Sequence, residues 1–394
     1  MAKIGLVAVT YKDNFGSALQ TYATQYVLQK MGCETGIFQI DGVSNLINRR
    51  KAFFYMGRLF ASDERKYIFD QVVSKVKRTK KSELYSQNMR LRHECYEEFN
   101  KDYLCFLEEQ TDWDALRQQS LACDAVVVGS DQLWRPSNIA GRYFTLEFVP
   151  DGVKKIAYAT SFGVPVLPRA QISHAQKFLG RMDAISVREN TGKEIVKQLI
   201  GRNVPVVCDP TILLDAEEWM KIQRPEPVIQ GDYILCYLLG DNQKHREFVK
   251  QLRRITGMPV VGLLHGSNYI ASDETLADIA PFDVGPCEFI NLIRNAQYVC
   301  TDSFHGTVFS ILNRRSFFTF GRYRETSDFS TNDRVNTLLA WCGLSDRLML
   351  GDESTEAMLA EEIHYDAVHD LIDEKRTESL RYLADALGPA FIGV

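Results

Sequence analysis

The stretch DAVVVGSDQLW, residues 124–134, is a run of apolar, β-branched residues that turns abruptly polar after a glycine. A short run of this kind is typical of a strand that is covered on both faces of a parallel sheet. Similar runs lie around it in the first half of the chain: IGLVAV (4–9), GIFQI (36–40), KIAYATS (155–161), AISV (184–187) and VPVVC (204–208). Because helix-like segments separate them, these runs predict a doubly wound α/β domain.

A second series of apolar runs follows the polar stretch KIQRPEPVIQGD (221–232), which we interpret as a linker. Its members are YILCYLL (233–239), MPVVGLL (258–264), a weaker IAPFDV (279–284), QYVCTD (297–302) and SFFTF (316–320). A chain of 394 residues also exceeds the usual size of one hydrophobic core.

Together the two series predict α/β architecture with two Rossmann-like domains that face each other across a cleft, as in GT-B glycosyltransferases. We expect an N-terminal domain over 1–220 and a C-terminal domain over 230–345. A helical tail over 346–394 is expected to pack back on the N-terminal domain.

The interval between the second and third runs is too long for one crossover helix, so residues 45–110 are predicted to be a helical insertion. Its basic segment, residues 49–92, carries thirteen Lys/Arg and four Asp/Glu, a charge of +9 that leaves −14 on the rest of the chain. One interpretation is a solvated helical hairpin with a buried aromatic stripe. The other is a surface that contacts an anionic membrane or a lipid-phosphate-linked sugar.

Composition and charge restrict the function further. With 45% hydrophobic and 25% charged residues the chain is of globular type, and a net charge of −5 argues against a nucleic-acid binder. The nine cysteines are scattered singly, without zinc-site spacing, which favours a reducing compartment. The start, MAKIGLVAVTYKDN, has too short an apolar run for a signal peptide, so we expect a cytoplasmic protein, with peripheral contact at the inner membrane face as the further hypothesis.

Polar residues follow several apolar runs directly, where ligands bind in open α/β sheets. In YKDNFGS (11–17), Asn14 and Gly16 precede an expected helix, either as part of an anion site or as an N-cap with a turn glycine. In GSDQLW (129–134), Asp131 is a candidate N-cap, sugar ligand or general base. Trp134 either stacks on a sugar or packs in the core.

Two further strand ends carry a cation and a histidine. Arg188 in SVREN needs an anion if it is buried, either a ligand or an acid such as Glu189. His305 in TDSFHG lies between a strand and an expected helix start, where it can exchange a proton near a bound anion. Asp302 or Ser303 is the expected cap of that helix.

The motifs VVVGSDQLW, YATSFG, SVREN, CDPTILL, GPCEFINLIRNAQYVCTDSFHGTVFSI and the following NDR resemble the polysaccharide pyruvyl transferase family over residues 3–345. The resemblance implies a GT-B-like enzyme that moves the pyruvyl group of phosphoenolpyruvate onto two sugar hydroxyls as a cyclic ketal. It also implies that Arg188 binds the donor and that His305 is the family's histidine before glycine. Some members carry arginine where this chain has Ser303, so one donor contact is either absent or supplied elsewhere, with Arg334 and Arg322 as candidates.

This chemistry needs cations or N–H groups for the donor and groups that exchange protons, but neither a metal nor a redox cofactor. His305 is the expected general acid and Asp131 the base, and the reverse assignment stays open. The expected donor-binding residues are Arg188, Ser303, Gly306 and Arg334, and those facing the acceptor or cleft are Asn14, Gly16, Ser130, Trp134 and Ser161. The alternatives are a nucleotide-sugar-dependent GT-B glycosyltransferase and a non-catalytic sugar-binding protein of the same fold.

Overall fold

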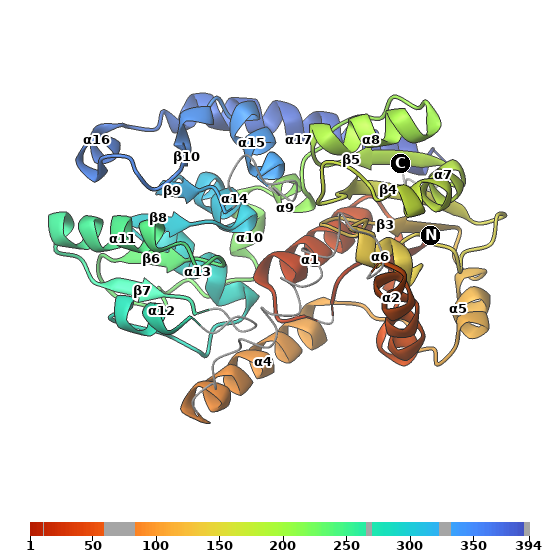
Figure 1. Cartoon of the computed structure of the whole chain (residues 1–394), viewed down its shortest axis with the longest axis horizontal. Helices are drawn as coiled ribbons and strands as arrows, with labels where there is room; N and C mark the ends of the chain where they lie inside the picture. Colours follow the sequence, from red (N-terminus) through yellow and green to blue (C-terminus); the bar gives the residue numbers. More distant parts are fainter. Residues whose placement is uncertain (11, 59–82, 265–269, 323–331, 390–394) are drawn as a thin grey trace.

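The computed structural model describes residues 1–10, 12–58, 83–264, 270–322 and 332–389 (Figure 1). It contains two parallel sheets of five strands each. The first is built from β1 (Lys3–Val7), β2 (Glu34–Ile37), β3 (Ala125–Val128), β4 (Lys154–Thr160) and β5 (Ala184–Val187). The second is built from β6 (Ile234–Tyr237), β7 (Val260–Gly262), β8 (Tyr298–Thr301), β9 (Ser316–Phe320) and β10 (Leu348–Met349).

The two sheets share one strand order. The first runs β2-β1-β3-β4-β5, and the second, read from its other edge, runs β7-β6-β8-β9-β10, which is the same sequence of positions. This is the flavodoxin-like doubly wound order, in which the connection reverses direction between the first and third strands. The predicted fold class, two Rossmann-like α/β domains, is confirmed.

Helices cover both sheets and link them (Figure 1). Those that belong to the first half of the chain are α1 (Phe15–Lys30), α2 (Ser44–Arg58), α4 (Glu83–Tyr103), α5 (Trp113–Ser120), α6 (Pro136–Gly141), α7 (Ile172–Gly180), α8 (Asn190–Ile200), α9 (Pro210–Leu213) and α10 (Ala216–Met220). Those of the second half are α11 (Gln243–Thr256), α12 (Ala271–Leu276), α13 (Pro286–Asn295), α14 (Phe304–Leu312), α15 (Asp333–Trp341), α16 (Thr355–Ala360) and α17 (Tyr365–Leu387).

Helix α1 lies between the two halves and is buried along most of its length. Its polar residues are therefore satisfied inside the protein: the hydroxyls of Thr21 and Thr24 donate to carbonyls one turn earlier. The Gln25 amide donates to the carbonyl of Tyr103 at the end of α4. This position puts the N-terminus of α1 where residues of both halves meet.

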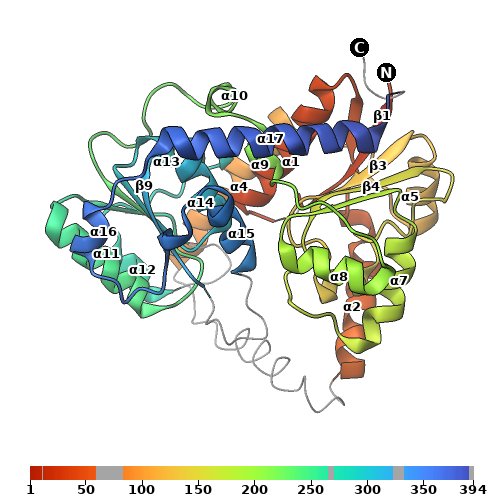
Figure 2. The ribbon, with the colours of Figure 1, turned by 90° about the horizontal axis from the view of Figure 1, so that it is seen from above.

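A single buried apolar cluster contains residues of both sheets, including Leu6 of β1 and Leu235 of β6. Helix α17 adds to this shared core, because it runs across both halves of the molecule (Figure 2). Near its start His369 contacts the carbonyl of Ile311, and at its end Lys154 of β4 donates to the carbonyl of Leu387. The two sheets are therefore joined by packing as well as by the linker.

Two of the expected strands are each reduced to a single bridge. In VPVVC (204–208) only Val206 pairs with β5, because Pro205 has no N–H to continue the ladder. In IAPFDV (279–284) only Ile279 pairs with β7. Much of the basic segment, residues 59–82, lies outside the described residues; α2 and α4 flank it.

Candidate active site

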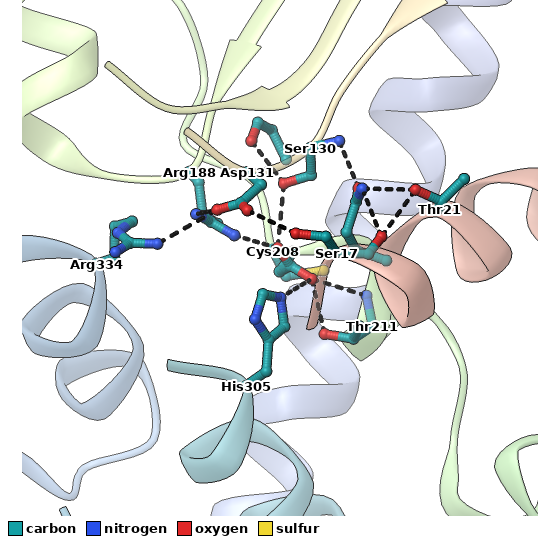
Figure 3. Close-up of polar contacts among 12 residues, drawn as sticks. Ser17, Thr21, Ser130, Asp131, Arg188, Cys208, Thr211, His305 and Arg334 are labelled. Atoms are coloured by element: carbon teal, nitrogen blue, oxygen red, sulfur yellow. Dashed lines mark hydrogen bonds and ion pairs between the residues drawn. The ribbon is translucent and has the colours of Figure 1, made fainter. Parts of the chain in front are cut away.

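The carboxyl ends of strands from both sheets meet beside the N-terminus of α1. In a sheet of this order, ligands bind outside the carboxyl ends where the connection reverses direction. Asp131 follows β3, Arg188 follows β5, and His305 follows β8 in the other sheet. Together with Asp209 and Arg334 they form a group that we call the interdomain cluster (Figure 3).

Asp209 is the centre of the interdomain cluster. It caps the start of α9 and accepts hydrogen bonds from the backbone N–H and hydroxyl of Thr211 at 3.0 and 2.7 Å. Its other oxygen accepts from the hydroxyl of Ser130 at 3.1 Å and forms an ion pair with Arg188. Burial alone would raise the pKa of Asp209, but the positive charges of His305 and Arg188 outweigh it and lower the pKa well below its usual range.

Arg188 is held between two carboxylates. Its side chain is 1% exposed; one terminal nitrogen pairs with Asp209 and the other lies 3.0 Å from Asp131 Oδ1. The ring of Phe304 packs against the guanidinium at 4.6 Å. Arg188 therefore forms salt bridges with acids other than Glu189, which is one of the two predicted alternatives. Its role in binding the donor stays a prediction.

Asp131 joins the two halves of the cluster. It adopts a left-handed backbone conformation, with φ of 75°, which aspartate tolerates better than most residues. Arg334 of α15 reaches Asp131 Oδ1 at 3.5 Å, and the hydroxyl of Ser17 donates to Oδ2 at 3.3 Å. Burial opposes ionisation of Asp131, but Arg188 and Arg334 prevail and lower its pKa strongly. A carboxylate held in this way is a weak base.

His305 enters the cluster from α14. Its Nε2 lies 3.6 Å from Asp209 Oδ1, an ion-pair distance that is too long for a hydrogen bond. The other side of the ring lies against Gly16, where a Cβ would come within 1.9 Å of His305 Nδ1. Glycine at this position of α1 therefore lets the two halves approach each other at the histidine.

The remaining predicted donor residues shape the helix that carries His305. Ser303 caps α14 by accepting from the N–H of Gly306 at 3.4 Å. Gly306 itself packs against Thr301, where a Cβ would lie 2.5 Å from the hydroxyl oxygen. Both residues thus position His305, and the Gly306 N–H is already engaged by the cap. Arg322 donates to the carbonyl of Asp302 and pairs with the carboxylate of the same residue at 3.5 Å.

The residues that were expected to face the acceptor have different roles in the structure. Asn14 caps α1 by accepting from the N–H of Ser17 and also lines a cavity beside the cluster. Ser130 is fully buried and orients Asp209, and Ser161 lines a small polar recess with Arg334.

The expectation that Trp134 faces the cleft is wrong. Its side chain is buried between Phe162 and Phe178, and its indole N–H donates to the carbonyl of Phe144. Asp131 forms a bridge with Thr160 of β4, and the following residues turn into the core beneath the sheet edge. Trp134 therefore packs in the core, which is the other predicted alternative.

Three residues of this region were not among the predicted site residues. Asp209 follows an apolar run and precedes proline, which is an N-cap signature within CDPTILL. Glu189 is buried, and burial raises its pKa to about 7 although Arg188 and Arg334 oppose the shift. Lys12 has its pKa lowered by burial and by Arg135, while Asp131 acts in the opposite direction.

The charges of this region favour an anionic ligand. In the interdomain cluster two guanidinium groups balance two carboxylates beside the His305 imidazole. The Lys12 ammonium and the buried Glu189 carboxyl lie close to the cluster. Asp131 and Arg334 are its most exposed members, with side chains 22% and 12% exposed. A ligand that reaches the cluster from this side can contact both the Arg334 guanidinium and the Asp131 carboxylate.

The polysaccharide pyruvyl transferase family model matches residues 14–322, a range that holds all of these residues except Lys12 and Arg334. The chain belongs to this family. Pyruvyl transfer to a polysaccharide is accordingly its general activity. No curated protein matches the chain.

Several solved structures are similar over nearly the whole chain. UDP-GlcNAc 2-epimerase from Methanocaldococcus jannaschii has 12% identity and a TM-score of 0.49, covering 95% of this chain and 94% of its own. The epimerase from Neisseria meningitidis bound to UDP-GlcNAc has 11% identity and a TM-score of 0.47, covering 98% and 99%. MurG from Acinetobacter baumannii has 8% identity and a TM-score of 0.43, covering 98% of each chain.

Proposed function

We propose that the enzyme transfers the pyruvyl group of phosphoenolpyruvate onto two hydroxyls of one sugar in a polysaccharide or lipid-linked oligosaccharide precursor. The C2–O bond to phosphate breaks, two C–O bonds form at C2, and C3 gains a proton. The diol releases two protons, of which one goes to C3 and the other leaves with phosphate. The reaction is balanced without an oxidant or reductant, and phosphoenolpyruvate is the one co-substrate it requires.

The observation that carries this proposal is the meeting of His305 with Arg334 and Arg188 at the facing sheet edges. Phosphoenolpyruvate bears a carboxylate and a phosphate, which planar guanidinium groups bind well. In this proposal Arg334 and Lys12 bind the donor, because Arg188 is already held by two carboxylates. Arg188 then fixes the positions of Asp131 and Asp209.

The proton exchanges are assigned from the surroundings of each group. His305 acts as general acid toward C3, with Asp209 orienting its ring at 3.6 Å. Asp131 is a poor base because its pKa is held low by Arg188 and Arg334, although burial opposes them. Glu189, whose pKa burial raises to about 7, lies in the same recess as Arg334 and is our candidate for the second proton-exchanging group.

One feature of the second sheet speaks against the nucleotide-sugar alternative. In doubly wound folds a diphosphate binds backbone N–H groups where the connection reverses direction. Here the Asp302 carboxylate accepts from the N–H groups of Leu239 and Gly240, at 2.7 and 2.8 Å, between β6 and β8. An anionic side chain thus already occupies the position that a nucleotide diphosphate would need.

The direct test is incubation with phosphoenolpyruvate and candidate saccharides. We expect phosphate release together with the mass gain of one pyruvyl group, and a new methyl signal by NMR that separates the ketal from an enol ether of equal mass. His305→Asn should stop the reaction and keep the fold. Thermal stabilisation by a nucleotide sugar and none by phosphoenolpyruvate would instead support the glycosyltransferase alternative.

A further inference from the structure

A cavity of about 500 Å³ lies between the start of α1, helix α4 of the insertion and the ends of β6 and β7. Its walls combine the rings of Phe15, Tyr96 and Tyr237 with the cationic side chains of Lys12 and Arg92. This volume is within the range of small-ligand sites. The three rings pack on one another and on Phe289, which gives the cavity a rigid apolar wall. The cavity and the interdomain cluster adjoin, because Phe15 faces the cavity while the next residue, Gly16, contacts His305.

Arg92 in the wall of this cavity is a buried cation without a carboxylate partner among the described residues. Its side chain projects from α4, and the whole residue is 4% exposed. The terminal nitrogens donate to backbone carbonyls of Leu264 and Pro281. Its Nε–H has no hydrogen-bond partner in the described part of the chain.

The surroundings of Arg92 leave its charge unbalanced. The rings of Phe15 and Phe282 lie 5.8 and 5.5 Å from the guanidinium carbon. Burial lowers its pKa, and the groups that oppose this shift are tyrosines and a cysteine instead of a carboxylate. A buried charge of this kind is costly unless a counter-ion reaches it. Asp13, which also lines the cavity, is paired with His93 on the outer side.

We propose that this cavity binds the saccharide acceptor and that Arg92 recognises a negatively charged group on it, a carboxylate or a phosphate. This inference rests on the proposed pyruvyl transfer, because it places the acceptor beside the cluster that holds the donor. Arg334 and Lys12 bind the small donor at the cluster, while the aromatic walls and Arg92 hold the larger acidic sugar. The insertion thereby selects the acceptor, since α4 supplies Arg92 and Tyr96.

The test compares three probes that differ in charge: methyl glucoside, glucuronate and glucose 1-phosphate. Binding is measured by calorimetry on the full chain with saturating phosphoenolpyruvate, so that the donor site is filled, and inorganic phosphate serves as a fourth probe. We expect one of the two acidic sugars to bind about tenfold more tightly than methyl glucoside, because a charge-assisted hydrogen bond to a buried group has that magnitude. Preference for glucuronate identifies a carboxylate, and preference for glucose 1-phosphate over inorganic phosphate identifies a sugar phosphate.

Variants assign the preference to Arg92. Arg92→Gln should abolish it, and Arg92→Lys, which keeps the charge, should retain part of it. Arg90→Gln is the matched control, because it removes the same charge from an exposed position of α4 and should leave the preference unchanged. If Arg92→Gln fails to fold, the inference is tested by comparing the affinity ratio of acidic sugar to methyl glucoside in Arg92→Lys with the same ratio in the wild type.

Equal binding of neutral and acidic sugars would overturn the inference, and so would an unchanged preference in Arg92→Gln or in Arg92→Lys. The proposed transfer is scored separately, by stabilisation with phosphoenolpyruvate and by phosphate release. If both of those signals are absent while the preference for acidic sugars persists, the proposed role of phosphoenolpyruvate as donor is rejected and the proposed anion site at Arg92 is retained.

Discussion

Replacing Asp209 with asparagine removes one buried charge from the interdomain cluster and preserves the shape of the side chain. In the wild type this carboxylate is 0% exposed, accepts hydrogen bonds from Thr211 and Ser130, and pairs with Arg188. An amide presents a donor where one carboxylate oxygen accepts. It also leaves Arg188 with Asp131 as its one remaining counter-charge in the cluster.

The expected cost follows from these contacts. Breaking a buried ion pair by removing one partner destabilises a protein by about 3–5 kcal/mol. We expect a loss near the lower end, about 3 kcal/mol, because the amide oxygen can still accept from Thr211. Turnover should fall by about a hundredfold or more, since His305 loses the group that orients its ring.

Urea unfolding followed by tryptophan fluorescence measures the first effect, and phosphate release measures the second. Asp366→Asn is the matched control, because that carboxylate is 92% exposed and its pair with Arg314 should contribute less than about 1 kcal/mol. Adding Arg188→Met to Asp209→Asn should cost less than the sum of the single substitutions. Asp209→Asn that is as stable and active as Asp366→Asn would refute the role given to this charge.

Four other predictions concern residues around the same region. For Glu189→Gln, the free energy of unfolding should rise by about 3 kcal/mol relative to the wild type between pH 5 and pH 8. The reason is that burial raises the folded-state pKa of Glu189 to about 7 from 4.5, so the wild type loses stability as pH rises through this window. Urea titrations at both pH values measure this difference, and a difference that does not change with pH would contradict the prediction. Gly16→Ala should destabilise by about 1–3 kcal/mol and lower turnover, since the added carbon would lie 1.9 Å from His305 Nδ1; normal activity would show that the ring is not held there. Arg334→Gln should raise the KM for phosphoenolpyruvate by about tenfold or more with the fold intact, with exposed Arg314→Gln as control, and an unchanged KM would remove Arg334 from the donor site. The membrane hypothesis predicts salt-sensitive co-sedimentation with anionic vesicles, supported by Phe53 and Met56, which are 58% and 49% exposed on α2; absence of binding at low salt would dispose of it.

The sequence was sufficient for the strands that carry the cluster. AISV coincides with β5, and the runs around DAVVVG and QYVCTD contain β3 and β8. These strands are buried on both faces and therefore consist of continuous apolar residues, which is a strong local signal. Arg188 was identifiable because it follows such a run directly, and His305 because it lies in the short polar segment after one.

The local sequence pattern does not predict the direction in which each side chain points. Trp134 and Asp131 lie in one loop, yet the first packs in the core and the second meets Arg334 from a helix about two hundred residues later in the chain. The partner of Arg188 likewise depends on how α9 begins, because Asp209 is the N-cap of that helix. VPVVC had the composition of a strand, but Pro205 limits it to one bridge.

No helix in the described ranges is long and apolar enough to cross a membrane. Helix α2 carries both basic and exposed apolar side chains, which is the feature on which the membrane-contact hypothesis rests. This contact remains a prediction.

Helix α17 bears on how the chain can be divided in the laboratory. The Ser379 hydroxyl accepts from the N–H of Cys208, and Arg376 donates to the carbonyl of Ile212, both in the segment that follows the first sheet. A fragment that ends at the linker would therefore lack Leu383 and Leu387 and expose the part of the shared core that they cover. Expressing this fragment alone should give insoluble material, whereas co-expression with the missing C-terminal piece should restore solubility.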